Sequence, residues 1–116
     1  MDRSRKITSP DGLLQLAVLR EANDIIVGFI GFEWHTHGDL LSAEYERRGE
    51  GILSQDAAVE RFIGEVVSGR WPIVVSRVQG AIQGVWVSAD VQSEFKYQRP
   101  GDVLEVRRWD GKAWPS

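Results

Sequence analysis

The chain has 116 residues, which fits one domain spanning residues 1–116, and its 42% hydrophobic and 27% charged residues exclude disorder by composition. The formal net charge of −3 argues against a dedicated nucleic-acid binder, which usually carries a basic footprint. Because the sequence contains no cysteine, disulfides, thiolate metal sites and cysteine nucleophiles are excluded.

The N-terminal part predicts a β-hairpin. Residues 1–9 are polar and are expected to form a loose arm or an edge strand. After the turn signal at residues 10–12, apolar side chains alternate over residues 14–18, which predicts a strand. Residues 25–32 are rich in β-branched and aromatic side chains and predict its hairpin partner. Gly28 interrupts this second strand and indicates a bulge or a close approach by another element.

Two helices are predicted in the middle of the chain. The apolar spacing after Leu40 indicates a short helix with Gly49 as its C-terminal cap. The second helix is longer, with Ser54 as N-cap and Gly69 at its end. Its apolar stripe has helical spacing and consists of Ala58, Val59, Phe62, Ile63, Val66 and Val67.

The remainder of the chain predicts strands over residues 73–78, 82–88, 94–98 and 103–109. Strands, then helices, then strands again are typical of an α+β fold rather than a parallel α/β fold. We therefore expect a mostly antiparallel sheet of five or six strands. The long helix and the short helix are expected to pack on one face of that sheet.

The sequence favours a cytoplasmic location. Residues 1–6 are charged and no apolar segment follows them, so we expect no signal peptide. The longest apolar run, residues 25–32, is far shorter than the roughly 20 residues that a membrane-spanning helix needs. We therefore expect neither a membrane nor a nucleic acid as a partner.

The segment Trp34–Asp39 carries most of the functional interest. His35 and His37 are the only histidines of the chain, and in an extended segment both imidazoles would point to the same side. Such a pair could hold zinc or another divalent metal, with Glu33 in phase or Asp39 as a third ligand. A catalytic zinc requires three protein ligands and one open position.

Simpler roles are available for the same residues, because a His-x-His pattern is short and arises often by chance. Asp39 could be the N-cap of a helix that begins at Leu40. Either histidine could bind a backbone carbonyl at the strand-to-helix corner, and Trp34 could be part of the core or a pocket wall. A histidine with Asp39 or Glu33 could also be a general base, with Thr36 or Ser42 as a nucleophile. No cofactor is predicted outright.

Four segments together resemble small uncharacterised bacterial α+β proteins: residues 34–39, 76–78, 85–87 and 105–109. The likeness covers about residues 13–114 in its order of elements. Some proteins of this description resemble the immunity proteins of toxin–immunity systems. That resemblance implies a cytoplasmic, non-enzymatic inhibitor, and the acidic balance of the chain would suit a basic nuclease toxin. It assigns no functional residues.

Three hypotheses follow, and the first is favoured because the sequence holds no complete catalytic constellation. The first is a non-enzymatic bacterial binding protein, immunity-like, that takes a protein partner or a small ligand at Trp34, His35, His37 and Asp39. The second is a small metal-dependent hydrolase that uses the same histidines with Asp39 or Glu33. The third is an oligomeric scaffold, for which a homodimer is the expected form.

Overall fold

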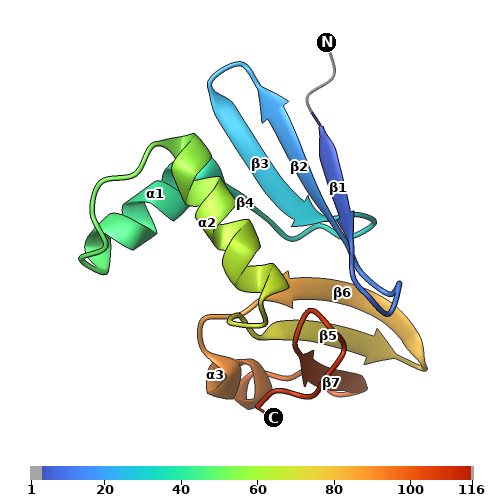
Figure 1. Ribbon diagram of the computed structural model, residues 1–116. Helices are drawn as coiled ribbons and strands as arrows, with labels where there is room; N and C mark the ends of the chain where they lie inside the picture. The colour runs from blue at the N-terminus through green and yellow to red at the C-terminus, as the bar shows by residue number, and fades with distance from the viewer. Residues whose placement is uncertain (1–3, 116) are drawn as a thin grey trace.

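The computed structural model describes residues 4–115, which form two antiparallel sheets and three helices (Figure 1). Sheet A has the strand order β1-β2-β3-β4, and sheet B has the order β6-β5-β7. The α+β class predicted from the sequence is therefore confirmed. The elements are β1 (Arg5–Thr8), β2 (Gln15–Glu21), β3 (Asp24–Phe29), β4 (His35–His37), α1 (Gly38–Arg47), α2 (Gln55–Val67), β5 (Ile73–Val78), β6 (Ala81–Val87), α3 (Val91–Lys96) and β7 (Asp102–Arg107).

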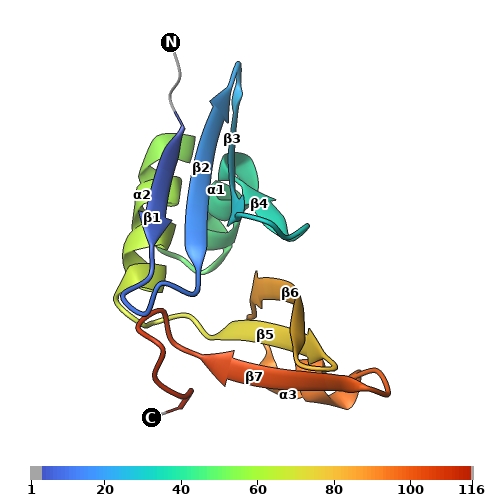
Figure 2. The same cartoon turned by 90° about the vertical axis from the view of Figure 1, so that its right-hand side faces the viewer.

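The expected single sheet of five or six strands is corrected to two sheets. β5 pairs with β6 on one side and with β7 on the other, so sheet B is completed without a strand from the N-terminal half. α1 and α2 separate the two runs of strands in the chain, and both helices lie on one side of sheet A (Figures 1 and 2). The strands that follow them pair with one another at one end of sheet A.

Sheet A has one buried face and one open face. The β2–β3 hairpin is confirmed, with Leu16 opposite Phe29 and Val18 opposite Val27. β1 is an edge strand on β2, as one of the two alternatives for residues 1–9 predicted, although residues 1–3 lie outside the described chain. The face toward the helices is formed by alternate side chains of β2 and β3 that are at most 5% exposed: Leu16, Val18, Ile25, Val27 and Phe29.

The predicted second strand is shorter than expected at its C-terminal end. β3 ends at Phe29, and residues 30–33 form a turn in which Gly31 has a φ of +91°. Residues with a side chain rarely adopt a φ in that region. Glycine therefore permits the chain to reverse its direction there. The chain then returns beside β3 as the short strand β4.

Both predicted helices are present. Ser54 caps α2 as expected, since its hydroxyl accepts a hydrogen bond of 3.1 Å from the Ala57 backbone N–H. α2 buries the predicted apolar stripe except Val67, which is 43% exposed. α1 begins at Gly38, so the N-cap is His37 and the expected capping role of Asp39 is corrected.

The predicted strand over residues 94–98 is also corrected, because residues 91–96 form the helix α3. The alternation of Phe95 and Tyr97 indicated a strand, but the Asp90 side chain accepts a hydrogen bond of 3.2 Å from the Ser93 backbone N–H and caps a helical turn. A bond of 2.6 Å from the Trp86 indole N–H to Glu94 ties α3 to sheet B.

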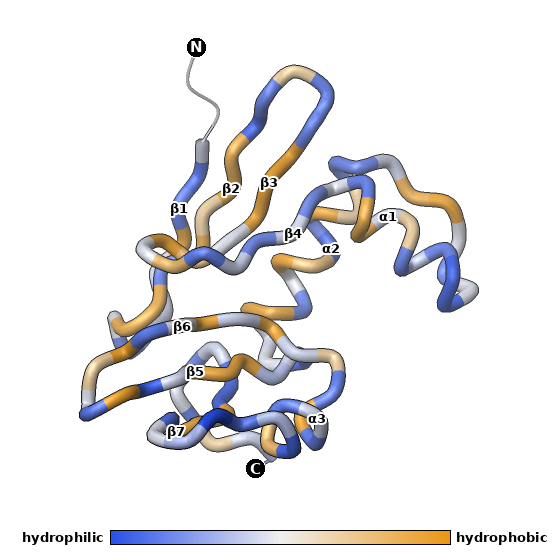
Figure 3. The backbone as a smooth tube through the Cα atoms, turned by 180° about the vertical axis from the view of Figure 1, so that it is seen from behind, coloured by the Kyte–Doolittle hydropathy of each residue, from blue (hydrophilic) through white to orange (hydrophobic). Residues whose placement is uncertain are grey.

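The buried core is one continuous cluster to which both sheets and two helices contribute. Figure 3 shows hydrophobic segments along β2, β3 and β5, whereas hydrophilic segments flank the tip of the β2–β3 hairpin. No helix within residues 4–115 is long and apolar enough to cross a membrane. The largest members of the cluster include Leu14, Leu16, Phe29, Tyr45, Phe62, Ile63, Ile73 and Trp109.

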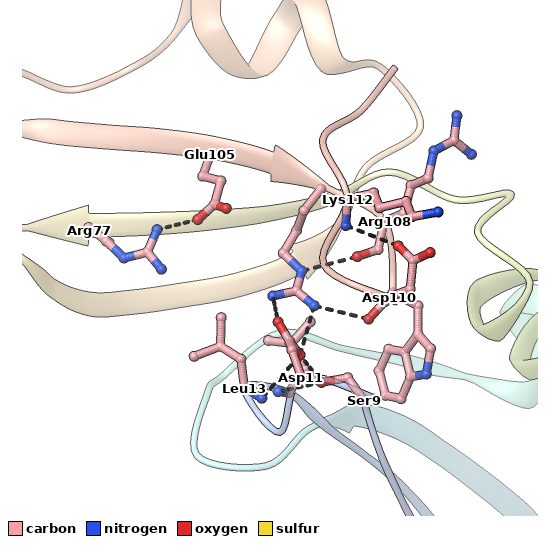
Figure 4. A network of polar contacts seen from close by, with 11 residues as sticks. Ser9, Asp11, Leu13, Arg77, Glu105, Arg108, Asp110 and Lys112 are labelled. Atoms are coloured by element: carbon pink, nitrogen blue, oxygen red, sulfur yellow. Dashed lines mark hydrogen bonds and ion pairs between the residues drawn. The ribbon is translucent and has the colours of Figure 1, made fainter. Parts of the chain in front are cut away.

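A buried arginine joins the two sheets. Arg107, at the end of β7, is 2% exposed and forms two bonds, of 2.7 and 3.1 Å, with the Asp11 carboxylate in the β1–β2 loop. Its guanidinium also donates to the backbone carbonyls of Arg108 and Trp109. Figure 4 shows this network, in which the Ser9 hydroxyl donates to the same carboxylate.

Candidate functional site

His35 and His37 lie on the open face of sheet A. In the β3–β4 register, Gly28 is opposite His35 and Ile26 is opposite His37. Residues that face each other in an antiparallel pair project on the same side of the sheet. The two rings therefore lie on the side away from α1 and α2, and the expectation that they share one side is confirmed. Their centroids are 5.1 Å apart and their planes cross at 75°.

Each imidazole is held through its Nδ1 atom. The Nδ1 of His35 lies 2.9 Å from the Glu33 backbone oxygen, and the Nδ1 of His37 lies 2.8 Å from Oδ2 of Asp24. A backbone carbonyl and a carboxylate are acceptors, so in both rings Nδ1 carries the proton that is donated. In the neutral rings the lone pair is then on Nε2, and Nε2 is the nitrogen available to a ligand.

A glycine in β3 makes room for this arrangement. A Cβ atom at Gly28 would lie 2.9 Å from the Trp34 carbonyl oxygen and 3.1 Å from the His35 Cβ. Cβ atoms in proteins essentially never approach another heavy atom as closely as 2.9 Å. The contacted oxygen belongs to the backbone, so it cannot move aside as a flexible side chain would. The close approach predicted for Gly28 is therefore confirmed, and the approaching element is β4.

The other residues predicted for this site lie in different surroundings. Trp34 is partly buried against the core, with its ring 5.8 Å from that of Phe29. The exposed Asp39 accepts a bond of 2.8 Å from the Leu40 backbone N–H. The backbone oxygen of Glu33 accepts the hydrogen bond from His35, and Glu33 is exposed to solvent. Within residues 4–115, no group of three or more His, Asp or Glu side chains is placed to hold a metal ion.

Asp24 is the residue of this site that the sequence did not indicate. It lies 13 residues before His37 and is the first residue of β3. We name Asp24, His35 and His37 the histidine corner. The register of the β2–β3–β4 strands could have indicated Asp24, because it places this residue two positions from the partner of His37.

A shallow depression of about 590 Å³, wide open to solvent, lies beside His37; we call it the cavity beside His37. Three carboxylates, of Glu21, Asp24 and Asp39, contribute to its wall, and no lysine or arginine does. Such a wall favours a cationic group over an anionic one. The full lining is Glu21, Ala22, Asn23, Asp24, His37, Asp39 and Leu40.

Next to the histidine corner, the open face of sheet A carries an apolar strip. Leu19 is opposite Ile26, and Ala17 is opposite Gly28, so these residues project on the same side as the two histidines. Leu19 is 40% exposed, and Ala17 and Ile26 are half-buried. We name Ala17, Leu19 and Ile26 the apolar strip.

Comparison of the chain with protein-family models, curated proteins and solved structures finds no match. The resemblance to immunity proteins therefore stays a prediction. The open face of sheet A thus carries the histidine corner and the apolar strip.

Proposed function

We propose that this chain is a non-enzymatic binding protein that docks a basic protein partner on the open face of sheet A. The observation that carries the proposal is the apolar strip, which lies on the face away from α1 and α2 and has Leu19 40% exposed. An apolar group on an open sheet face gains free energy when a partner removes it from water.

Charge supports a basic partner. The acidic residues Glu21 and Asp24 border the strip at the end where the histidine corner lies, whereas Lys6 of β1 lies opposite Ala17. A partner that places lysine or arginine beside these carboxylates would gain both encounter rate and specificity. An apolar centre with a charged rim is the usual anatomy of a protein interface.

The geometry disfavours catalysis by a hydroxyl nucleophile that a histidine activates. Thr36 is opposite the buried Val27, so its hydroxyl lies on the other side of β4 from the two imidazoles. The Ser42 hydroxyl donates a bond of 2.5 Å to the Leu53 carbonyl in the connection between α1 and α2. Neither hydroxyl considered as a nucleophile is therefore paired with a histidine, as nucleophilic catalysis requires.

The class of partner that fits both the apolar strip and the acidic residues beside it is a toxin that this chain inhibits. The inhibitor of a nuclease must cover a surface built to bind phosphates, which is basic. An acidic rim beside an apolar strip is complementary to such a surface. In this proposal the chain acts as an immunity-like protein and contributes no chemistry of its own.

The proposal is tested by affinity capture from the cells that naturally make the protein, with a matched pair of variants. Leu19 and Val67 have similar exposure, 40% and 43%, but lie on the open face and on α2 respectively. We expect Leu19→Lys to lose a partner that Val67→Lys retains, with affinity reduced about 30-fold or more if Leu19 is a central contact.

The captured complex is then reconstituted from two purified proteins, and its mass is measured by light scattering. A one-to-one complex with a basic protein that Leu19→Lys abolishes supports the proposal. Equal capture by the two variants would place the interface elsewhere. A wild-type chain that is a homodimer, and that Leu19→Lys turns into a monomer, would favour the scaffold alternative.

A further inference from the structure

We propose that His35 and His37 form a two-imidazole chelate for a divalent transition metal ion of borderline softness, with Zn²⁺ as the best fit. This inference goes beyond partner docking, because it needs only the chain and the ion. Imidazole nitrogen is a preferred ligand for zinc, copper and nickel.

The spacing of the two rings matches zinc coordination. Because Zn–N bonds are about 2.0 Å long, the centre of each ligating imidazole lies ~3.1 Å from the ion, and a tetrahedral angle places two such centres ~5 Å apart. The centroids of His35 and His37 are 5.1 Å apart. The spacing of the two rings is therefore compatible with both binding one ion.

The Nδ1 contacts prepare both rings to bind through Nε2. His37 donates to the Asp24 carboxylate, which forms the first part of a carboxylate–histidine–metal arrangement. His35 donates to the Glu33 backbone carbonyl, the other acceptor commonly found behind a metal-bound histidine. Both acceptors fix the tautomer and the ring orientation, and the carboxylate also increases the basicity of the ligating nitrogen.

The surroundings suit a cation that keeps open positions. The cavity beside His37 has the carboxylates of Glu21 and Asp39 in its wall together with Asp24. Two protein ligands leave two positions of a tetrahedral ion to water or to a side chain of a docked partner. The ion would lie on the same open face as the apolar strip.

The test is a titration of the untagged, purified chain with Zn²⁺ alone. Binding is monitored during the titration by calorimetry and by the NMR signals of the two imidazoles. We expect one equivalent to bind in the micromolar range and to shift the signals of both rings. Ni²⁺ alone should broaden the same two signals. His35→Ala and His37→Ala should each abolish binding at one equivalent, because one exposed imidazole cannot chelate.

Three conservative variants separate this site from a diffuse acidic one. Asp24→Asn should weaken Zn²⁺ binding about 10- to 100-fold, because it removes the acceptor behind His37. Asp39→Asn and Glu33→Gln should leave the affinity within about threefold, since neither carboxylate contacts the rings. Near-UV circular dichroism of each variant shows whether its fold is intact.

Two results would overturn the proposal: no heat and no imidazole shift at millimolar Zn²⁺, or binding that survives in the His35→Ala, His37→Ala double variant. A loss with Asp39→Asn as large as with Asp24→Asn would instead indicate a site made of carboxylates. No partner is present in this titration, so its outcome is independent of the Leu19→Lys capture experiment.

Discussion

The Asp11–Arg107 and Asp24–His37 contacts both join separate elements of the chain, and they differ in what surrounds them. The Asp11–Arg107 contact has an arginine that is 2% exposed and that also donates to two backbone carbonyls. In the Asp24–His37 contact both side chains are partly exposed, 41% and 31% respectively. In the first, the guanidinium is committed to groups of the protein. In the second, Asp24 occupies one imidazole nitrogen and leaves the other for a ligand.

Burial separates the two contacts, because the first is enclosed by the protein and the second is open to solvent. Removal of a buried charge's partner leaves an uncompensated group that water cannot reach. Removal of an exposed partner costs little, because water takes its place. The following predictions test this division, in order of decreasing effect on stability.

Arg107→Ala should cause the largest loss of stability. We expect the free energy of unfolding to fall by about 3 kcal/mol, because the variant loses the pair with Asp11 and removes the donor of the Arg108 and Trp109 carbonyls. Urea unfolding followed by tryptophan fluorescence measures the change. The matched control is Arg77→Ala, which breaks a partly exposed pair with Glu105 on the same sheet and should cost no more than about 1 kcal/mol. Equal losses would contradict the division.

Gly28→Ala should cost about 1–3 kcal/mol, because its new methyl group must push the β4 backbone away. Gly64→Ala in α2 is the matched control, and we expect it to increase the stability instead. A Cβ at Gly64 would meet nothing within 4 Å, and alanine favours a helix over glycine by roughly 0.5–1 kcal/mol. Thermal unfolding of the two variants should shift in opposite directions. A Gly28→Ala protein as stable as the wild type would mean that β4 moves freely.

Acid should weaken the sheet-joining contact. Hydrogen bonds from Arg107 and from Ser9 hold the pKa of the Asp11 carboxyl well below its ordinary value of 3.8. A lowered carboxyl pKa contributes stability that is complete above the ordinary value and is lost as the pH falls toward the folded value. From about pH 5 to pH 3, wild-type stability should therefore fall more steeply than that of Asp11→Asn. Parallel urea midpoints over this range would refute the assignment.

Asp24→Asn should have the smallest effect on folding, within about 1 kcal/mol, because the contact is partly exposed. Chemical unfolding without metal measures this change. The same variant is expected to show the large loss of Zn²⁺ affinity described above. A strongly destabilised Asp24→Asn protein would make this contact structural, like that of Asp11.

The local elements could be predicted because their signals are short-range. The hairpin follows from alternation on both sides of a polar turn, and α2 follows from Ser54, the apolar stripe and Gly69. The sequence does not predict α3, because Phe95 and Tyr97 alternate as in a strand. The hydrogen bond from the Ser93 backbone N–H to the Asp90 side chain, which caps the helix, spans only three residues. Here a local hydrogen bond prevails over side-chain alternation.

The division into two sheets could not be read from the sequence. Whether β5 joins β3 or forms its own sheet depends on pairings between distant residues, and each candidate strand has a similar apolar pattern. The buried Arg107 was equally hidden. Its partner Asp11 is 96 residues away in the sequence.

The site was half predictable for the same reason. A spacing of two residues in an extended segment is enough to place His35 and His37 on one side. Their acceptors are different: Asp24 comes from the neighbouring strand, and the acceptor of His35 is a backbone oxygen rather than the Glu33 carboxylate. Glu33 and Asp39 each lie two residues from a histidine in the sequence. Their carboxylates nevertheless do not form the hydrogen bonds that hold the two imidazoles.

The close approach at Gly28 also has an evolutionary consequence. Because any Cβ there would collide with the Trp34 carbonyl, a lineage that replaces this glycine must also rebuild the return of the chain into β4. The two histidines lie on that return. The glycine and the histidine pair should therefore be inherited and lost together, even though they are separated in sequence.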